Sequence, residues 1–137
     1  MKLSRRRFAL LAPAVAAAQE KLPTLPSKAY VYEDLPVKPN GQNRQRSVLH
    51  GLNHSGFPVE LHLTELGPGQ QPHPPHRHVH EEIVMLQSGV LDVMIEGKTT
   101  RLTPGSVAYV ASNEFHGWRN PGEGRTQYFI LELGPDK

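Results

Sequence analysis

Hydrophobic and polar residues alternate along most of the chain after residue 28, and this period of two is typical of β-strands. In the run VELHLTEL, residues 59–66, apolar side chains take the odd positions and polar ones the even positions up to Thr64. We therefore expect Val59, Leu61 and Leu63 to be buried and His62 to face solvent. Further strands are expected over AYVYEDL (29–35), RSVLHGL (46–52), EEIVMLQ (81–87), VLDVMIE (90–96), SVAYVA (106–111) and TQYFILEL (126–133).

Turn sequences rich in Gly, Pro and Asn separate these runs, among them KPNG, NHSG, TPGS and NPGEG. No segment of the mature chain keeps a helical period of 3.6. Short strands at close, regular spacing predict an all-β fold, a single small barrel or sandwich of the jelly-roll or Greek-key kind. The length of 137 residues suits one domain, which we place at 29–137. Residues 19–28 contain two prolines and are expected to form an extended lead-in.

Residues 1–18 have the pattern of an export signal: a basic start, an apolar run and small residues before Gln19. The segment SRRRF resembles a twin-arginine signal, although Ala9 stands where a bulkier residue is commoner. A general secretory signal is the alternative. Either route predicts a periplasmic or secreted protein with no membrane anchor after cleavage. The chain has no cysteine, so neither disulfides nor thiolate ligands are available to it.

The basic character of the chain depends on this segment. The sequence pI is about 9.0, but four of the 15 Lys and Arg residues precede position 19. Without them, 11 basic residues face 13 acidic ones. The charge balance therefore predicts neither a nucleic-acid partner nor an anionic membrane partner for the mature chain.

Four of the eight histidines lie in the stretch HPPHRHVHEE, residues 73–82. His76, His78 and Glu82 have the same parity, so on a continuous strand their side chains would share one face. Imidazole nitrogens and carboxylate oxygens are good ligands for divalent first-row metals. A fourth ligand has to come from elsewhere in the chain, and His116 is the only histidine C-terminal to this stretch.

Two spacings in the sequence resemble the two-part signature of the cupin superfamily. The first is H-x-H-x3-E-x6-G, which begins at His76 and ends at Gly89. The second is G-x5-A-x-N-x2-H-x3-N, which begins at Gly105 and ends at Asn120. Ala111 and Asn113 replace the proline and glycine of the family pattern, whereas the ligand positions are intact. The resemblance covers about residues 69–120 and implies a small jelly-roll barrel.

This resemblance implies a metal held by His76, His78, Glu82 and His116. The metal would be a divalent transition ion, one of Fe, Mn, Ni, Co, Cu or Zn, and it would keep open positions for a small-molecule substrate. The implied activity is that of a quercetin-dioxygenase-like oxidoreductase on a small anionic or aromatic substrate, with Glu82 as the catalytic base. Decarboxylation or oxidation of a small carboxylate is a related option. A non-catalytic protein that holds a metal or a small ligand outside the cytoplasm is the alternative.

The remaining histidines and aromatic residues are assigned less directly. We expect His80 to cap a bend or to support the ligands from outside, His73 to be non-ligating, and His50, His54 and His62 to lie at the surface. Val84 and Leu86 share the face of the ligands. Phe115, Trp118, Tyr109 and Tyr128 either line an apolar pocket or fill the core. A homodimer paired through residues 29–35 is the expected assembly.

Overall fold

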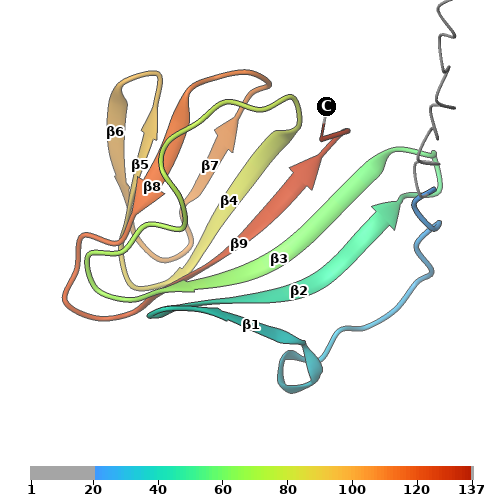
Figure 1. Ribbon diagram of the computed structural model, residues 1–137, viewed down its shortest axis with the longest axis horizontal. Helices are drawn as coiled ribbons and strands as arrows, with labels where there is room; N and C mark the ends of the chain where they lie inside the picture. Colours follow the sequence, from blue (N-terminus) through green and yellow to red (C-terminus); the bar gives the residue numbers. More distant parts are fainter. Residues whose placement is uncertain (1–20, 137) are drawn as a thin grey trace, which may run out of the picture.

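The computed structural model describes residues 21–136 and shows two antiparallel β-sheets that pack face to face (Figure 1). The larger sheet has the strand order β1-β2-β3-β9-β4-β7, and the smaller one has the order β6-β5-β8. The strands are β1 (Val37–Asn40), β2 (Asn43–Leu52), β3 (Pro58–Leu66), β4 (Glu81–Ser88), β5 (Leu91–Ile95), β6 (Lys98–Leu102), β7 (Val107–Val110), β8 (His116–Arg119) and β9 (Thr126–Leu133). The prediction of a small all-β jelly roll is confirmed.

The hydrophobic core lies between the two sheets. It consists of Leu66, Val84, Leu86, Leu91, Val93, Leu102, Trp118, Tyr128 and Ile130. Val84 and Leu86 on β4 face it, as the parity of EEIVMLQ predicts. The Trp118 indole donates a hydrogen bond of 2.9 Å to the hydroxyl of Tyr128, so the polar atoms of both rings are satisfied inside this core.

The prediction for β3 holds only in part, because Leu63 is buried as expected but His62 does not face solvent. His62 and Thr64 lie directly opposite Ile130 and Tyr128 of β9, so the even positions face the interior. The odd positions are covered as well, because residues 63–66 are all buried and Tyr32 donates a hydrogen bond to Glu65 on the outer face. Alternation separates the two faces of a strand but does not say which of them points inward.

The expected strand over residues 29–35 is also wrong. Tyr32–Asp34 form a short 3-10 helix, η1, and Pro36 follows it. The edge of β2 is occupied by β1, which includes the residues KPN, although the sequence KPNG predicts a turn. Residues 29–35 therefore provide no edge strand for a homodimer, and the assembly stays a prediction. The strands β6 and β8 were missed as well, because both are short and carry polar residues.

The expected signal segment, residues 1–18, lies outside the described residues, so export stays a prediction. Of the lead-in, residues 21–28 are described, and Thr24 forms a single bridge with Leu52 at the end of β2. No helix among the described residues is long and apolar enough to cross a membrane.

Gly89, the residue after β4, should be the glycine least tolerant of a side chain. Its φ is +79°, and an added Cβ would lie 2.5 Å from Thr126 Oγ1 and 2.6 Å from the Arg125 carbonyl. The Thr126 hydroxyl already links the start of β9 to the turn between β4 and β5. It donates a hydrogen bond to the carbonyl of Val90 and accepts one from the Val90 N–H. We expect Gly89→Ala to lower the free energy of unfolding by about 2–4 kcal/mol.

Gly97→Ala is the matched control for this prediction. Gly97 has a φ of +82°, but nothing lies within 4 Å of its added Cβ. This variant isolates the cost of the left-handed backbone, about 1 kcal/mol. Urea unfolding of both variants measures the difference. Equal losses of unfolding free energy in Gly89→Ala and Gly97→Ala would show that the packing of residue 89 against Thr126 is unimportant.

Candidate metal centre

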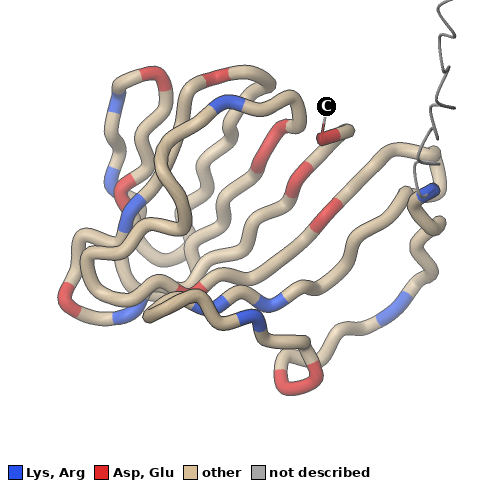
Figure 2. The backbone as a smooth tube through the Cα atoms, viewed as in Figure 1, with Lys and Arg blue, Asp and Glu red and all other residues tan. Residues whose placement is uncertain are grey.

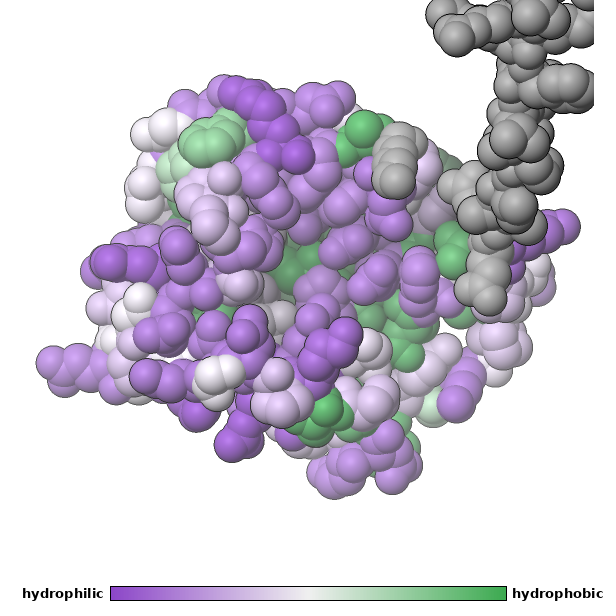
Figure 3. All heavy atoms as spheres, viewed as in Figure 1, coloured by the Kyte–Doolittle hydropathy of each residue, from purple (hydrophilic) through white to green (hydrophobic). Residues whose placement is uncertain are grey.

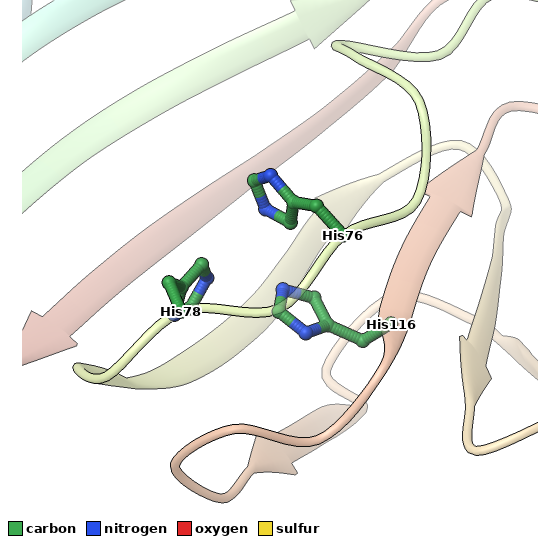
Figure 4. Close-up of side chains that lie close together, drawn as sticks. All are labelled: His76, His78 and His116. Atoms are coloured by element: carbon green, nitrogen blue, oxygen red, sulfur yellow. The ribbon is translucent and has the colours of Figure 1, made fainter.

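Three histidines from two separate segments meet at one end of the barrel (Figure 4). His76 and His78 lie on the loop before β4, and His116 is the first residue of β8. Two backbone hydrogen bonds of 3.0 Å join His76 to His116, so the loop is fixed to the smaller sheet. An added Cβ on Gly117 would lie 3.0–3.1 Å from Pro75, so only a glycine lets the loop pack this closely there.

The ligand atoms of these three histidines all lie within 4.8 Å of one another. Their ring centroids are 4.6–5.1 Å apart, and the rings meet edge to face. In Figure 4 the three rings converge on a common region. The predicted convergence of His76, His78 and His116 is therefore present in the fold, although His76 and His78 lie on a loop rather than on the continuous strand that the parity argument assumed.

Glu82, the second residue of β4, brings a carboxylate to the same place. Its Oε2 lies 3.0 Å from His116 Nε2 and 3.4 Å from His78 Nε2. A cation about 2.1 Å from each ligand atom would hold those atoms about 3.0–3.4 Å apart, so these separations suit a shared ion. The side chain is 5% exposed, which keeps water from competing for the carboxylate.

The hydrogen bonds of the rings leave ligand atoms free. The Nδ1 atoms of His78 and His116 lie 2.9 and 2.8 Å from the carbonyls of His80 and Glu114. A carbonyl can only accept, so Nδ1 carries the proton and Nε2 presents its lone pair to the cluster. Both Nε2 atoms and Glu82 Oε2 are buried without a hydrogen-bond partner among the described residues. Buried polar atoms are normally satisfied, so these orphaned atoms fit a bound cation.

Electrostatics favours the ionised form of the carboxylate. Burial raises the pKa of Glu82, but the nearby imidazoles of His116, His78 and His80 outweigh it and the net shift is downward. Burial lowers the pKa of His116, whereas Glu82 and the Glu114 carbonyl raise it above its ordinary value. The pKa of His76 is lowered, by burial first and then by the charges of the neighbouring histidines. The lowered pKa of Glu82 and the raised pKa of His116 show that positive charge is favoured between these two side chains.

Residues 62–132 match the family described as "Cupin domain", which is just over half of the chain. The protein belongs to the cupin family. No curated protein matches the sequence.

Solved structures show the same cupin fold. The structure of KdgF from Halomonas sp. has a TM-score of 0.70 and 18% sequence identity, and the match covers 80% of this chain and 96% of that one. An RmlC-like cupin from Shewanella frigidimarina has a TM-score of 0.68 and 17% identity over 82% and 95% of the two chains. A predicted oxalate decarboxylase from Thermotoga maritima has a TM-score of 0.65 and 17% identity over 79% and 100%. At these identities the likeness concerns the fold.

His80 lies behind the candidate metal ligands of this cupin. Its ring stacks on that of His78 with centroids 3.6 Å apart, and its Nε2 lies 3.8 Å from Glu82 Oε1. Of the two expected roles, this position fits support of the ligands, and the ligand atoms of His78, His80 and Glu82 also lie within 4.8 Å of one another. The ring centroid of His73 lies 4.2 Å from that of His76. The Nδ1 of His73 donates a hydrogen bond to the Pro74 carbonyl. It belongs to none of the clusters with metal-binding spacing among the described residues.

A cavity of about 420 Å³ opens beside the cluster, and Glu82 forms part of its wall. Figure 3 shows a hollow in this face of the molecule, with apolar surface among hydrophilic residues. The lining combines the apolar side chains of Trp118, Tyr128 and Ile130 with polar ones. The polar lining residues are Lys38, Asn40, Asn43, Arg44, Gln45, His62, Thr64, His73, Glu82 and Glu132.

The pocket of this cupin therefore has a mixed lining, to which Trp118 and Tyr128 contribute but Tyr109 and Phe115 do not. Tyr109 is 53% exposed on the outside of β7 and donates a hydrogen bond to Glu81, and Phe115 is 37% exposed. His62, expected at the surface, lines the cavity with only 12% of its side chain exposed. The alternating polar residues at positions 60, 62 and 64 were the signal for it, and they were assigned to the wrong face of β3.

Glu132 on β9 should make the stability of the metal-free protein depend on pH. Burial raises the pKa of Glu132 from 4.5 to about 7, and the charge of Glu60 adds to the shift. Because the folded chain favours the neutral form, this stabilisation is complete below pH 4.5 and is lost as the pH rises to about 7. Relative to Glu132→Gln, we expect the wild type to lose about 1–2 kcal/mol of unfolding free energy across that range.

Urea unfolding at a series of pH values, with a chelator present, measures this difference. The exposed Glu123 provides the control variant Glu123→Gln, which should follow the wild type at every pH. A constant difference between wild type and Glu132→Gln would contradict the prediction.

Proposed function

We propose that this cupin is a metal-dependent oxidoreductase, of the dioxygenase kind, that acts on a small anionic organic substrate. The observation that carries the proposal is the cluster of His76, His78 and His116, with the Glu82 carboxylate 3.0–3.4 Å from two of the rings and unpartnered Nε2 and Oε2 atoms beside a cavity. Three neutral imidazoles and one carboxylate leave a divalent ion with a formal charge of +1 and with open coordination positions. A bound redox-active metal would supply the reaction between dioxygen and the substrate.

The cavity supports an anionic substrate. Lys38 and Arg44, on the β1–β2 hairpin, line it opposite the apolar side chains of Trp118 and Ile130. A substrate with an acidic group and an apolar or aromatic body matches both parts of this lining. His76 is exposed, which leaves the outer side of the cluster accessible to small molecules.

Glu82 is the proposed catalytic residue. Its carboxylate belongs both to the histidine cluster and to the cavity wall, so it can touch a substrate that enters from the cavity. The lowered pKa of Glu82 keeps it ionised and ready to accept a proton from a substrate hydroxyl. His80 Nε2 lies 3.8 Å from Glu82 Oε1, within ion-pair distance of that oxygen but beyond hydrogen-bond distance.

Oxygen uptake tests the proposal. The protein is stripped of metal, reloaded separately with Fe, Mn, Ni, Co, Cu or Zn, and mixed with flavonols, catechols, diketones or small carboxylates. Small carboxylates belong in the panel because one solved structural neighbour is described as a predicted oxalate decarboxylase. We expect oxygen consumption with at least one redox-active metal, and both oxygen atoms in the product.

Glu82→Gln, analysed for bound metal as well as for turnover, separates chemistry from binding, because an amide oxygen can still face the cluster but cannot accept the proton. It should bind substrate and lose turnover. Release of carbon dioxide without oxygen uptake would point to a decarboxylase instead. Bound metal and bound substrate without turnover in any combination would favour a non-catalytic binding protein and overturn the proposal.

A further inference from the structure

Three carboxylates lie side by side on the inner face of the larger sheet. Glu132 on β9 stands directly opposite Glu60 of β3 on one side and Glu82 of β4 on the other. Figure 2 shows acidic segments next to one another on these three strands. Their side chains are 31%, 17% and 5% exposed in the order Glu60, Glu132 and Glu82. Like charges directly across a strand pair repel each other, so either a bound proton or a bound cation stabilises this row.

Histidines are the only basic side chains within ion-pair distance of the row among residues 21–136. His62 Nδ1 lies 3.5 Å from Glu60 Oε1 and 3.9 Å from Glu132 Oε1. His80 Nε2 lies 3.5 Å from Glu132 Oε2, and His50 Nε2 lies 3.9 Å from Glu60 Oε2. No Lys or Arg in this part of the chain pairs with Glu60, Glu82 or Glu132. Within this distance the three carboxylates are thus faced by imidazoles alone.

The geometry around His62 suits a cation better than hydrogen bonds. Its Nδ1 is buried and has no hydrogen-bond partner among the described residues. The ligand atoms of Glu60, His62 and Glu132 all lie within 4.8 Å of one another. The distances of 3.5 and 3.9 Å are too long for strong hydrogen bonds but close to those between ligands of one shared ion.

We propose that Glu60, His62 and Glu132 bind a second divalent cation in the cavity, beside the cluster of His76, His78, Glu82 and His116. Two carboxylates and one imidazole neutralise a divalent ion, and this oxygen-rich set suits Zn²⁺, Mn²⁺ or Fe²⁺. His62 and Glu132 line the cavity, so the open coordination positions of the ion face the substrate space. His80 lies between the two sites, 3.8 Å from Glu82 and 3.5 Å from Glu132.

Zinc stoichiometry tests the second site without reference to activity. The full chain is stripped with a chelator, equilibrated with micromolar Zn²⁺, and analysed for zinc per chain. We expect two ions in the wild type and one in His62→Ala. Glu60→Gln should also lose one ion, and it keeps the shape of the side chain in case His62→Ala does not fold. His54→Ala, which alters an exposed turn residue, is the control and should keep both ions.

His78→Ala separates this inference from the proposed function. It should lose the ion of the histidine cluster and keep the ion at Glu60, His62 and Glu132, while a double variant with His62→Ala should bind none. One ion in the wild type that is unchanged in His62→Ala and Glu60→Gln would overturn the second site and leave the first intact. Loss of zinc in His62→Ala but not in His78→Ala would support the second site and contradict the first.

Discussion

Replacement of His116 by alanine is expected to abolish metal binding at the histidine cluster. His116 is fully buried and presents an unpartnered Nε2, and alanine supplies no ligand atom to replace it. Loss of a hydrogen-bond partner of a ligand already weakens metal affinity by about 10- to 100-fold, so loss of a ligand should weaken it by more than about 100-fold. The measurement is competitive titration against a chromophoric chelator, and any metal-dependent turnover should disappear in parallel.

The controls for this prediction address folding. His116→Ala also opens a gap in the interior, so circular dichroism and thermal unfolding must show a folded variant. His78→Ala provides a second test from the loop, where the side chain is 12% exposed and truncation disturbs less packing. His54→Ala should keep the affinity of the wild type. Unchanged metal affinity in folded His116→Ala and His78→Ala would mean that these imidazoles are not ligands.

The second large effect is expected at Asn120, which holds together the loop after β3 and the loop before β9. This residue is fully buried, and its Nδ2 donates to the carbonyls of Leu66, Gly67 and Gly124 at 2.7–3.2 Å. Its Oδ1 accepts from the N–H of Gly122 at 2.9 Å. Alanine would leave these buried groups without partners, so we expect Asn120→Ala to lower the free energy of unfolding by about 3–4 kcal/mol.

The position of Asn120 links this loss to the metal centre. Leu66 ends β3, and the loop that starts there carries Pro75 and His76 to their places against β8. We therefore expect weaker metal binding as well as lower stability. Urea unfolding measures the loss of stability. Gln87→Ala, an amide deletion at an exposed position, is the control and should change stability by less than about 0.5 kcal/mol. A loss below about 1 kcal/mol would show that the side-chain network of Asn120 is dispensable.

The meeting of His76, His78 and His116 was predictable because chemistry and spacing restrict the choices. The chain offers few histidines beyond the stretch at 73–82, and only His116 could complete a cluster with His76, His78 and Glu82. The period of two likewise predicted the strands of TQYFILEL and EEIVMLQ almost residue for residue. What the sequence did not show is that His76 reaches His116 through a backbone bridge from a loop, because that contact depends on how Pro75 packs on Gly117.

The polar face of β3 that lines the cavity could not be predicted from the alternation of polar and apolar residues. In β3 the apolar side chains at 59, 61 and 63 point away from the cavity, where residues around Tyr32 cover part of them, and His62 points inward. A strand that is covered on both faces gives the same alternating pattern whichever face lines a cavity. The polar content of that cavity, including His62 and Glu132, therefore became visible only once β3 and β9 were paired.

The most direct test of the central claim is a crystal structure of the metal-loaded protein with anomalous scattering recorded at the absorption edge of the bound metal. We predict a peak about 2.0–2.2 Å from His78 Nε2, His116 Nε2, a ring nitrogen of His76 and an oxygen of Glu82. A peak elsewhere with none at this position, or rings of residues 76, 78 and 116 that point to different places, would contradict the account.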